Sequence, residues 1–177
     1  MIDNDHHGAP VATFHWEGAV HHPSLSISHS HGHAFCALCR GPNIPLGADI
    51  ERIAPREPRF VEHFFTPQEI ELVERTPPPL RDGIITAIWS AKEAALKALR
   101  IGFTRKPQVA NCALAPPVEL PPSWTAFRIE WDPAALPDAP PLCGWWQVQE
   151  GFVFTLAARQ QSQAGQRSHV ACRQVDR

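Results

Sequence analysis

The stretch WSAKEAALKAL at residues 89–99 constrains the fold most strongly, because almost all of its residues are strong helix formers. Three prolines precede the surrounding segment and a glycine follows it, so the pattern predicts one long helix over about residues 80–100. Within this helix Trp89, Glu93 and Lys97 are spaced four apart and share one face beside an apolar stripe. The pattern therefore predicts an acid and a base at the edge of a buried surface, although an exposed Glu–Lys ion pair is the commoner reason for such spacing.

Length and composition limit the class of protein. With 177 residues, 44% of them hydrophobic, the chain is long enough for one buried core and short for two full domains. A net charge of −2 without a long basic run predicts no nucleic-acid partner. Five scattered cysteines fit reduced thiols of the cytosol, and neither a signal peptide nor an apolar run of membrane-spanning length is recognised. We therefore expect a soluble cytoplasmic protein with no membrane partner.

The rest of the chain predicts strands and two further helices. Alternating or β-branched patterns predict strands at 11–16, 24–27, 34–38, 46–53, 108–114, 124–131 and 151–158. A loop is expected to present Ser28, His29, Ser30 and His31. A short helix is expected over 59–65, and the sequence TPQE at 66–69 predicts a capping box that begins another helix. The proline-rich segment 132–144 is expected to be a surface loop, and the fold class is α+β, with an antiparallel sheet packed by the long helix.

Two acids, Asp49 and Glu51, lie two positions apart in one predicted strand, so both carboxylates are expected on the same face of the sheet. Like charges at ~4 Å and an effective dielectric near 20 repel by about 4 kcal/mol, which exceeds the gain from an exposed ion pair. A divalent cation relieves this repulsion, and together with Glu93 the two acids supply the hard oxygen ligands that suit magnesium. A strand end that exposes both acids to water is the alternative explanation.

Basic side chains near these acids suit a phosphorylated ligand. Magnesium usually keeps several waters and is completed by substrate phosphates. Lys92 and Lys97 are expected to contact those phosphates, with a further contact from residues 28–30. Acids, lysines and hydroxyls in this combination favour chemistry at a diphosphate.

A rival metal site lies in the segment that is rich in histidine and cysteine. Its nitrogen and sulfur ligands are of the kinds that zinc binds, namely His29, His31, His33, Cys36 and Cys39. If residues 34–38 form a strand that continues to Cys39, the two cysteines point to opposite faces and cannot reach one metal. A zinc-binding interaction module is therefore the alternative to an enzyme.

Four motifs occur along the chain in a fixed order, namely SLSISHS at 24–30, GADIE at 47–51, FFTPQE at 64–69 and WSAKEAALKAL at 89–99. In this order and at these separations they resemble the 4′-phosphopantetheinyl transferases, most closely the two-lobed surfactin-synthetase-activating type. The resemblance implies antiparallel sheets each packed by a helix, with an incomplete first lobe. It also implies Mg²⁺-dependent transfer of the 4′-phosphopantetheine arm of coenzyme A to a serine of an acyl or peptidyl carrier protein, with release of adenosine 3′,5′-bisphosphate.

The same resemblance implies roles for individual residues. The family's magnesium ligands fall on Asp49, Glu51 and Glu93, and Glu93 is also the expected base for the incoming serine. Lys97 is expected to steady the pyrophosphate, and the FFTPQE segment is expected to meet the carrier protein. Further contacts with the phosphates of coenzyme A are expected from Ser28, His29 and Lys92.

The resemblance also suggests how the chain is divided. Residues 1–45 are expected to form a partial N-terminal lobe, residues 46–159 the catalytic lobe, and residues 160–177 a disordered tail. Because the chain would begin inside the first lobe, the strand edge at 11–16 is expected to need cover, from residues upstream of Met1 or from a second copy. A catalytically degenerate domain that binds carrier protein or nucleotide without turnover is the alternative function.

Overall fold

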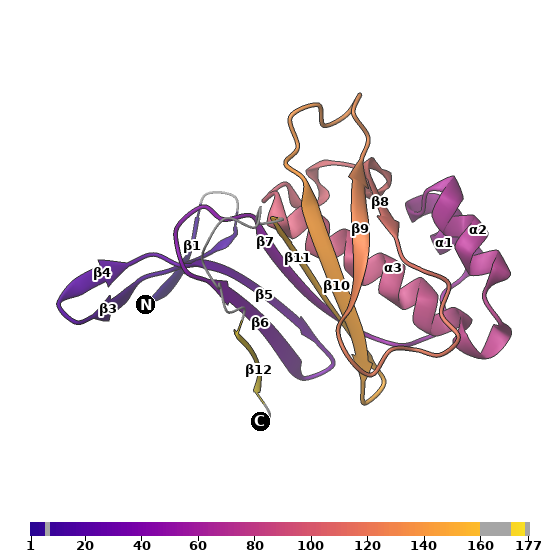
Figure 1. Cartoon of the computed structure of the whole chain (residues 1–177), viewed down its shortest axis with the longest axis horizontal. Coiled ribbons are helices and arrows are strands. Elements are labelled where there is room, and N and C mark those ends of the chain that lie inside the picture. Colours follow the sequence, from indigo (N-terminus) through magenta and orange to yellow (C-terminus); the bar gives the residue numbers. More distant parts are fainter. Residues whose placement is uncertain (6–7, 160–170, 176–177) are drawn as a thin grey trace.

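The computed structural model describes residues 1–5, 8–159 and 171–175. Within these residues, two antiparallel five-stranded sheets lie beside each other, and the helices lie on the side of the second sheet that faces away from the first (Figure 1). The predicted α+β class with antiparallel sheets is therefore confirmed. The change from one sheet to the other falls near residue 45, while the assignment of residues 1–45 and 46–159 as separate lobes remains a prediction.

The first sheet comes mainly from the N-terminal part of the chain. Its strand order is β1-β2-β5-β6-β12, with the bounds Ile2–Asn4, Pro10–Ala12, Ser24–Ser30, His33–Cys39 and Ala171–Val175. His31 and Gly32 join β5 to β6 in a tight turn, and both have positive φ angles, of 48° and 83°. A separate hairpin of β3 (Phe14–Trp16) and β4 (Ala19–His21) extends from this end of the molecule (Figure 1).

The second sheet is the central layer of the fold. Its strand order is β7-β11-β10-β9-β8, with the bounds Leu46–Arg52, Phe152–Arg159, Leu142–Gln149, Thr125–Trp131 and Ala110–Ala113. The long helix α3 (Pro78–Ala98) packs against one face, where Ile84, Ile88 and Ala91 join the main core. Phe35 and Ala37 of the first sheet pack against the other face. Because both faces are covered, β11 is a nearly continuous apolar strand.

The remaining α-helices begin as the sequence predicts. The short helix α1 spans Pro58–Phe64, and α2 spans Pro67–Arg75. The backbone N–H of Glu69 donates to the Thr66 hydroxyl at 3.3 Å, and the N–H of Thr66 donates to the Glu69 carboxylate at 2.8 Å, which confirms the capping box. In the described part of the chain, no helix is both long enough and apolar enough to cross a membrane.

Gly47 allows β7 and α3 to approach unusually closely. A Cβ atom built on this residue would lie 1.8 Å from the carbonyl oxygen of Ala94, which is far inside van der Waals contact. Only glycine fits there, because it carries no Cβ. Side chains alternate along a strand, so Asp49 and Glu51 point toward α3 like Gly47. The Gly-x-Asp-x-Glu pattern thus brings the strand close to the helix and directs both acids at it.

Several parts of the sequence prediction differ from the structure. The single strand expected at 11–16 is divided between β2 and β3, which belong to different sheets. Residues 28–30 belong to β5 rather than to a loop, because the turn needs only His31 and Gly32. Strand β10 was not predicted, and it begins inside the expected loop 132–144. In the expected disordered tail, Ala171–Val175 pair with β6, since the open edge of β6 offers unpaired backbone groups to any extended segment. The rest of that tail, 160–170 and 176–177, lies outside the described residues.

Candidate active site

Asp49 lies at the centre of the candidate site and is only 2% exposed. Its Oδ1 lies 2.7 Å from the Nζ of Lys97 and accepts a hydrogen bond of 2.8 Å from the Ser28 hydroxyl. Its Oδ2 accepts a hydrogen bond of 2.7 Å from the Ser90 hydroxyl. Strand β7 carries this carboxylate, and strand β5 and helix α3 both contact it, so it joins the two sheets to the long helix.

Lys97 brings a cation to the same place from the last turn of α3. Besides Asp49, its ammonium donates to the hydroxyl of Ser28 at 3.1 Å and to the carbonyl oxygen of Ala48 at 3.4 Å. Its side chain is 30% exposed, so one side of the ammonium meets solvent while the other meets the acid. The structure therefore brings three of the predicted residues, Ser28, Asp49 and Lys97, into direct contact.

Glu93 is the acid with the strongest perturbation. The pKa of its carboxyl is raised to about 7, mainly by burial and next by the negative charge of Asp49, with a smaller increase from Glu51, while the charge of Lys97 lowers it. Its Oε1 is buried and has no hydrogen-bond partner among the described residues. A buried oxygen without a partner is costly, and a catalytic role or a bound ion or water is among the explanations for it. Glu93 thus has the features of a group that exchanges a proton or binds a cation near neutral pH.

Glu51 is the third acid of the set. Burial raises the pKa of its carboxyl and the charge of Asp49 raises it further, whereas Arg56, a hydrogen bond with the Trp89 side chain and the charge of Lys97 lower it. Arg56 lies 3.4 Å from the Glu51 carboxylate. The expectation that Asp49 and Glu51 repel each other on one face of the strand is consistent with these shifts.

The three acids supply the right donors for a hard divalent cation, and the unpartnered Oε1 of Glu93 is available to one. In the arrangement described, however, no three His, Cys, Asp or Glu side chains among residues 1–5, 8–159 and 171–175 form a group that could hold a metal ion. The ammonium of Lys97 occupies the cationic position beside Asp49. The donor chemistry therefore fits a metal, while its coordination remains a prediction.

Lys92 does not lie where a phosphate ligand should. Its side chain has no exposed surface, and its ammonium lies 2.8 Å from the carboxylate of Glu69. It also donates to the carbonyl oxygens of Pro107 at 3.1 Å and Ala110 at 2.5 Å, so all three protons are used. Glu69 in turn accepts the backbone N–H of Cys112. The expectation that Lys92 contacts the phosphates is therefore wrong for this structure, since the lysine joins α2 and α3 to the start of β8.

The histidines of the first sheet lie apart from the acids. His29 follows Ser28 on β5, so its side chain points to the opposite face and lines a separate hollow of about 460 Å³ at the β5–β6 turn. The ring of His33 packs against Phe152, with 4.4 Å between ring centroids. Cys36 and Cys39 lie three positions apart on β6, which directs them to opposite faces. The structure thus brings Ser28, but not His29, to Lys97.

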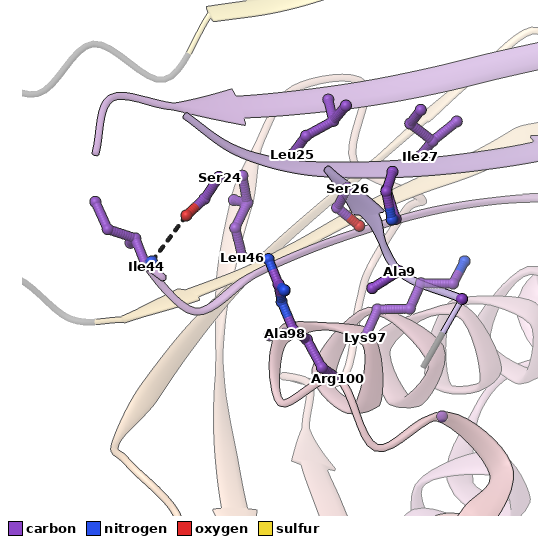
Figure 2. Close-up of a pocket in the computed structure, with 13 residues that line it drawn as sticks. Ala9, Ser24, Leu25, Ser26, Ile27, Ile44, Leu46, Lys97, Ala98 and Arg100 are labelled. Atoms are coloured by element: carbon purple, nitrogen blue, oxygen red, sulfur yellow. Dashed lines mark hydrogen bonds between the residues drawn. The ribbon is translucent and has the colours of Figure 1, made fainter. Parts of the chain in front are cut away.

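A cleft opens beside Lys97, between β5 and the end of α3 (Figure 2). Its volume is about 210 Å³. Ser26 and Ile27 lie on the strand side, and Lys97 and Arg100 come from the helix side (Figure 2). Arg100 also forms an ion pair with Asp5 at 2.9 Å. The cleft therefore combines serine and apolar side chains of the strand with two basic side chains next to the buried acids.

Two polar residues at the site were not predicted from the sequence. Ser90 and Thr155 are both fully buried, and their hydroxyl oxygens lie 2.8 Å apart beside Asp49. Thr155 is the one polar residue in the apolar run FVFTLAA of β11, which is the signal that could have identified it. Ser90 follows Trp89 at a fixed position of the helix motif, which is the signal for it, but the sequence analysis assigned no role to its hydroxyl.

The chain resembles known proteins both in sequence and in structure. A family profile described as the 4′-phosphopantetheinyl transferase superfamily matches residues 45–135, slightly more than half of the chain. The chain is 31% identical over 111 residues to the 4′-phosphopantetheinyl transferase HetI of Nostoc sp., which covers 59% of this chain and 46% of that protein. It is 38% identical over 56 residues to the holo-[acyl-carrier-protein] synthase of Streptococcus pyogenes, covering 32% and 48% of the two chains. The chain thus spans about half the length of the curated relatives it matches.

A solved structure shares the fold. The Helicobacter pylori holo-[acyl-carrier-protein] synthase in complex with coenzyme A aligns with a TM-score of 0.51 and 22% identity. The alignment covers 64% of this chain and 97% of that one. At this identity the similarity supports the arrangement of sheets and helices, and the roles of individual side chains must be argued from the site itself.

Proposed function

The chain belongs to the 4′-phosphopantetheinyl transferase superfamily, and from this premise we propose that it transfers the 4′-phosphopantetheine arm of coenzyme A to a serine of an acyl or peptidyl carrier protein. In this reaction a bond forms between the serine oxygen and the phosphorus that carries the pantetheine arm. The bond from that phosphorus to the bridging oxygen of the diphosphate breaks, and adenosine 3′,5′-bisphosphate leaves. The observation that carries the proposal is the set of coupled acids Asp49, Glu51 and Glu93 beside Lys97.

Glu93 is the proposed general base. A base works best when its pKa is near the working pH, and burial raises the pKa of Glu93 to about 7. At a slightly alkaline pH most of the protein then holds a carboxylate at this position. Its unpartnered Oε1 is the atom proposed to accept the proton of the serine hydroxyl.

Asp49, Glu51 and Glu93 are also the proposed ligands of Mg²⁺. When bound, the ion would neutralise charge on the diphosphate oxygens and so make the leaving group more stable. Glu93 Oε1 has no partner to give up, whereas Asp49 Oδ1 is shared with Ser28 and Lys97. The proposal therefore includes a change in the side-chain positions of the acids, because the arrangement described does not form a three-ligand group.

Lys97 and Arg100 are proposed to hold the phosphates of coenzyme A. Both are basic, and both line the cleft beside β5 (Figure 2). The Lys97 side chain is 30% exposed, and its ammonium contacts Asp49 while the residue lines this cleft, so it can reach the diphosphate of a coenzyme A bound there. Ser28 contributes a hydroxyl that already contacts the ammonium at 3.1 Å.

We further propose the two-lobed, surfactin-synthetase-activating type within the superfamily. Support comes from the contact of Ser28 in the first sheet with Asp49 and Lys97 in the second part of the same chain. The carrier protein is proposed to dock near the FFTPQE segment, which begins α2. Glu69 of that segment is buried with Lys92, so the docking surface must consist of its exposed neighbours.

One observation favours a second candidate, a degenerate domain that binds without turnover. Asp49 is fully engaged by Lys97, Ser28 and Ser90, and the acids do not form a ready metal site in the described residues. A single experiment separates the two candidates. The purified chain is incubated with coenzyme A, Mg²⁺ and a panel of apo carrier proteins, and intact mass spectrometry records the carrier.

A mass gain of one phosphopantetheine that requires Mg²⁺ supports the transferase. The matched control is Glu93→Gln, which keeps the shape of the side chain and cannot accept a proton. No gain on any carrier, from a folded chain that binds coenzyme A, would favour the degenerate domain.

A further inference from the structure

We propose that Ser90 and Thr155 form a buried pair of hydroxyls that positions Asp49 for the cation. This inference rests on the proposed function, because it assigns what holds a proposed metal ligand in place. Both residues have no exposed surface, so neither can touch coenzyme A or carrier protein. They are positioning residues that act through Asp49.

Hydrogen bonds link β11 to α3 at Ser90, and Ser90 to Asp49. The Thr155 hydroxyl donates to the backbone carbonyl oxygen of Ser90 at 2.9 Å and lies 2.8 Å from the Ser90 hydroxyl. The Ser90 hydroxyl donates to Asp49 Oδ2 at 2.7 Å. Thr155 is also the residue that pairs with Asp49 between strands β11 and β7. The pair therefore fixes Asp49 from the helix side and from the neighbouring strand at once.

The two oxygens of the Asp49 carboxylate have different partners. Oδ2 accepts a hydrogen bond from the Ser90 hydroxyl, which has a single proton. Oδ1 meets Ser28 and Lys97 on the side of the cleft. Hydrogen bonds from neighbouring groups commonly set the orientation of a metal-binding carboxylate and so its affinity. Ser90 thus keeps Oδ1 directed at the cationic position.

Another buried hydroxyl of α3, that of Thr86, bonds within its own helix, unlike the hydroxyl of Ser90. Thr86 lies one turn before Ser90 and is also fully buried. Its hydroxyl donates to the carbonyl oxygen of Asp82 at 2.8 Å, which is the usual way in which a helix satisfies such a group. Ser90 instead donates out of the helix to an acid on β7. Thr86 therefore provides a matched control for the removal of a buried hydroxyl.

The experiment measures the Kd for Mn²⁺ by electron paramagnetic resonance of the free ion, on the full chain without coenzyme A. Thr155→Val and Thr86→Val make the same change of hydroxyl to methyl at two fully buried sites, and each loses a bond to a backbone carbonyl. Thr155→Val and Ser90→Ala are expected to raise the Kd by roughly tenfold to a hundredfold. Thr86→Val should leave the Kd unchanged, and Ser90→Thr should stay within about threefold of the wild type because it keeps the hydroxyl.

Each outcome decides the proposal. Circular dichroism and thermal melting select the variants that are folded. Thr155→Val, which changes a side chain of similar shape on β11 and leaves the sequence of α3 intact, serves if Ser90→Ala does not fold. A wild type that binds Mn²⁺, with Thr155→Val binding equally well, overturns the positioning role and leaves the proposed function intact. An equal loss of affinity in Thr86→Val also overturns it, because the effect would then follow from any buried hydroxyl. A wild type that does not bind Mn²⁺ overturns the metal site and this inference together.

Discussion

Lys92→Met distinguishes a structural lysine from a phosphate ligand. The ammonium of Lys92 is completely buried and bonds to Glu69 at 2.8 Å, to the Pro107 carbonyl at 3.1 Å and to the Ala110 carbonyl at 2.5 Å. Methionine has a similar length and no charge, so the change removes all three contacts. It also leaves the carboxylate of Glu69 buried without its cation, although two backbone N–H groups still donate to it.

The expected cost follows from the burial of the pair. Removing one partner of a buried ion pair costs about 3–5 kcal/mol of stability, because the other charge stays in a medium of low dielectric. In a chain of this length each kcal/mol lowers the melting temperature by about 2–4 °C, so Lys92→Met should lower it by roughly 6–20 °C. Glu69→Gln breaks the same pair, so the double variant should be more stable than the sum of the two single losses predicts.

The assay combines thermal melting with calorimetric titration of coenzyme A on folded protein. Lys97→Met is the control, since it makes the same change on the same helix at a lysine whose side chain is 30% exposed. Lys97→Met should shift the melting temperature less and weaken coenzyme A more than Lys92→Met does. The structural role of Lys92 would be refuted if the Lys92→Met protein has the melting temperature of the wild type and binds coenzyme A at least roughly tenfold more weakly.

Other changes test the acids, the cleft and the packing of β7. Asp49→Ala and Glu93→Ala should each lower turnover by at least roughly a hundredfold in the carrier mass assay, and near-normal turnover of Glu93→Ala with a chelator present would contradict the mechanism. Lys97→Ala should weaken coenzyme A more than pantetheine, which has no diphosphate; calorimetry showing equal weakening would make it a surface lysine. Raising the pH should destabilise the wild type relative to Glu93→Gln in urea unfolding. The folded protein keeps the Glu93 proton up to a pKa of about 7, whereas the usual pKa of a glutamate carboxyl is 4.5, so the stabilisation from this proton is present below 4.5 and lost as the pH rises through 7. A constant difference between the two proteins would refute that pKa. Gly47→Ala should cost at least about 1–3 kcal/mol in the same assay, because its Cβ would meet the Ala94 carbonyl, and wild-type stability would show that the helix can move.

Local signals in the sequence predict the parts of the fold that local physics decides. The capping box at Thr66 and the long run of helix formers both give the observed helices, because caps and propensities act within a few residues. The alternation of a strand likewise predicts that Asp49 and Glu51 share a face. Strand β10 was missed because its first residues follow a proline-rich segment, and its pairing with β9 and β11 is a long-range event.

Regular spacing along one element accounts for only part of the predicted site. Glu93 and Lys97 are four apart and face the same side, whereas Lys92 and Lys97 are five apart and point about 140° away from each other around the helix. That angle already argues against both lysines meeting one diphosphate. The partner of Lys92 is Glu69, on a different helix, and no spacing rule connects the two. Tertiary packing therefore decides which lysine is buried.

The strand β5 shows how strongly the proposed chemistry depends on register. Along SLSISHS the serines face the second sheet and the apolar side chains face away, which reverses the usual pattern of a half-buried strand. The hydroxyl of Ser24 accepts the N–H of Ile44 at 2.8 Å, and that of Ser26 accepts the N–H of Ala48 at 2.9 Å. These two bonds fix the strand so that the next serine along the same face reaches Asp49. A slip of one residue would place Ile27 or His29 at this position. Ser24 and Ser26, which bond β5 to the following chain, therefore also set the position of the Ser28 hydroxyl at the site.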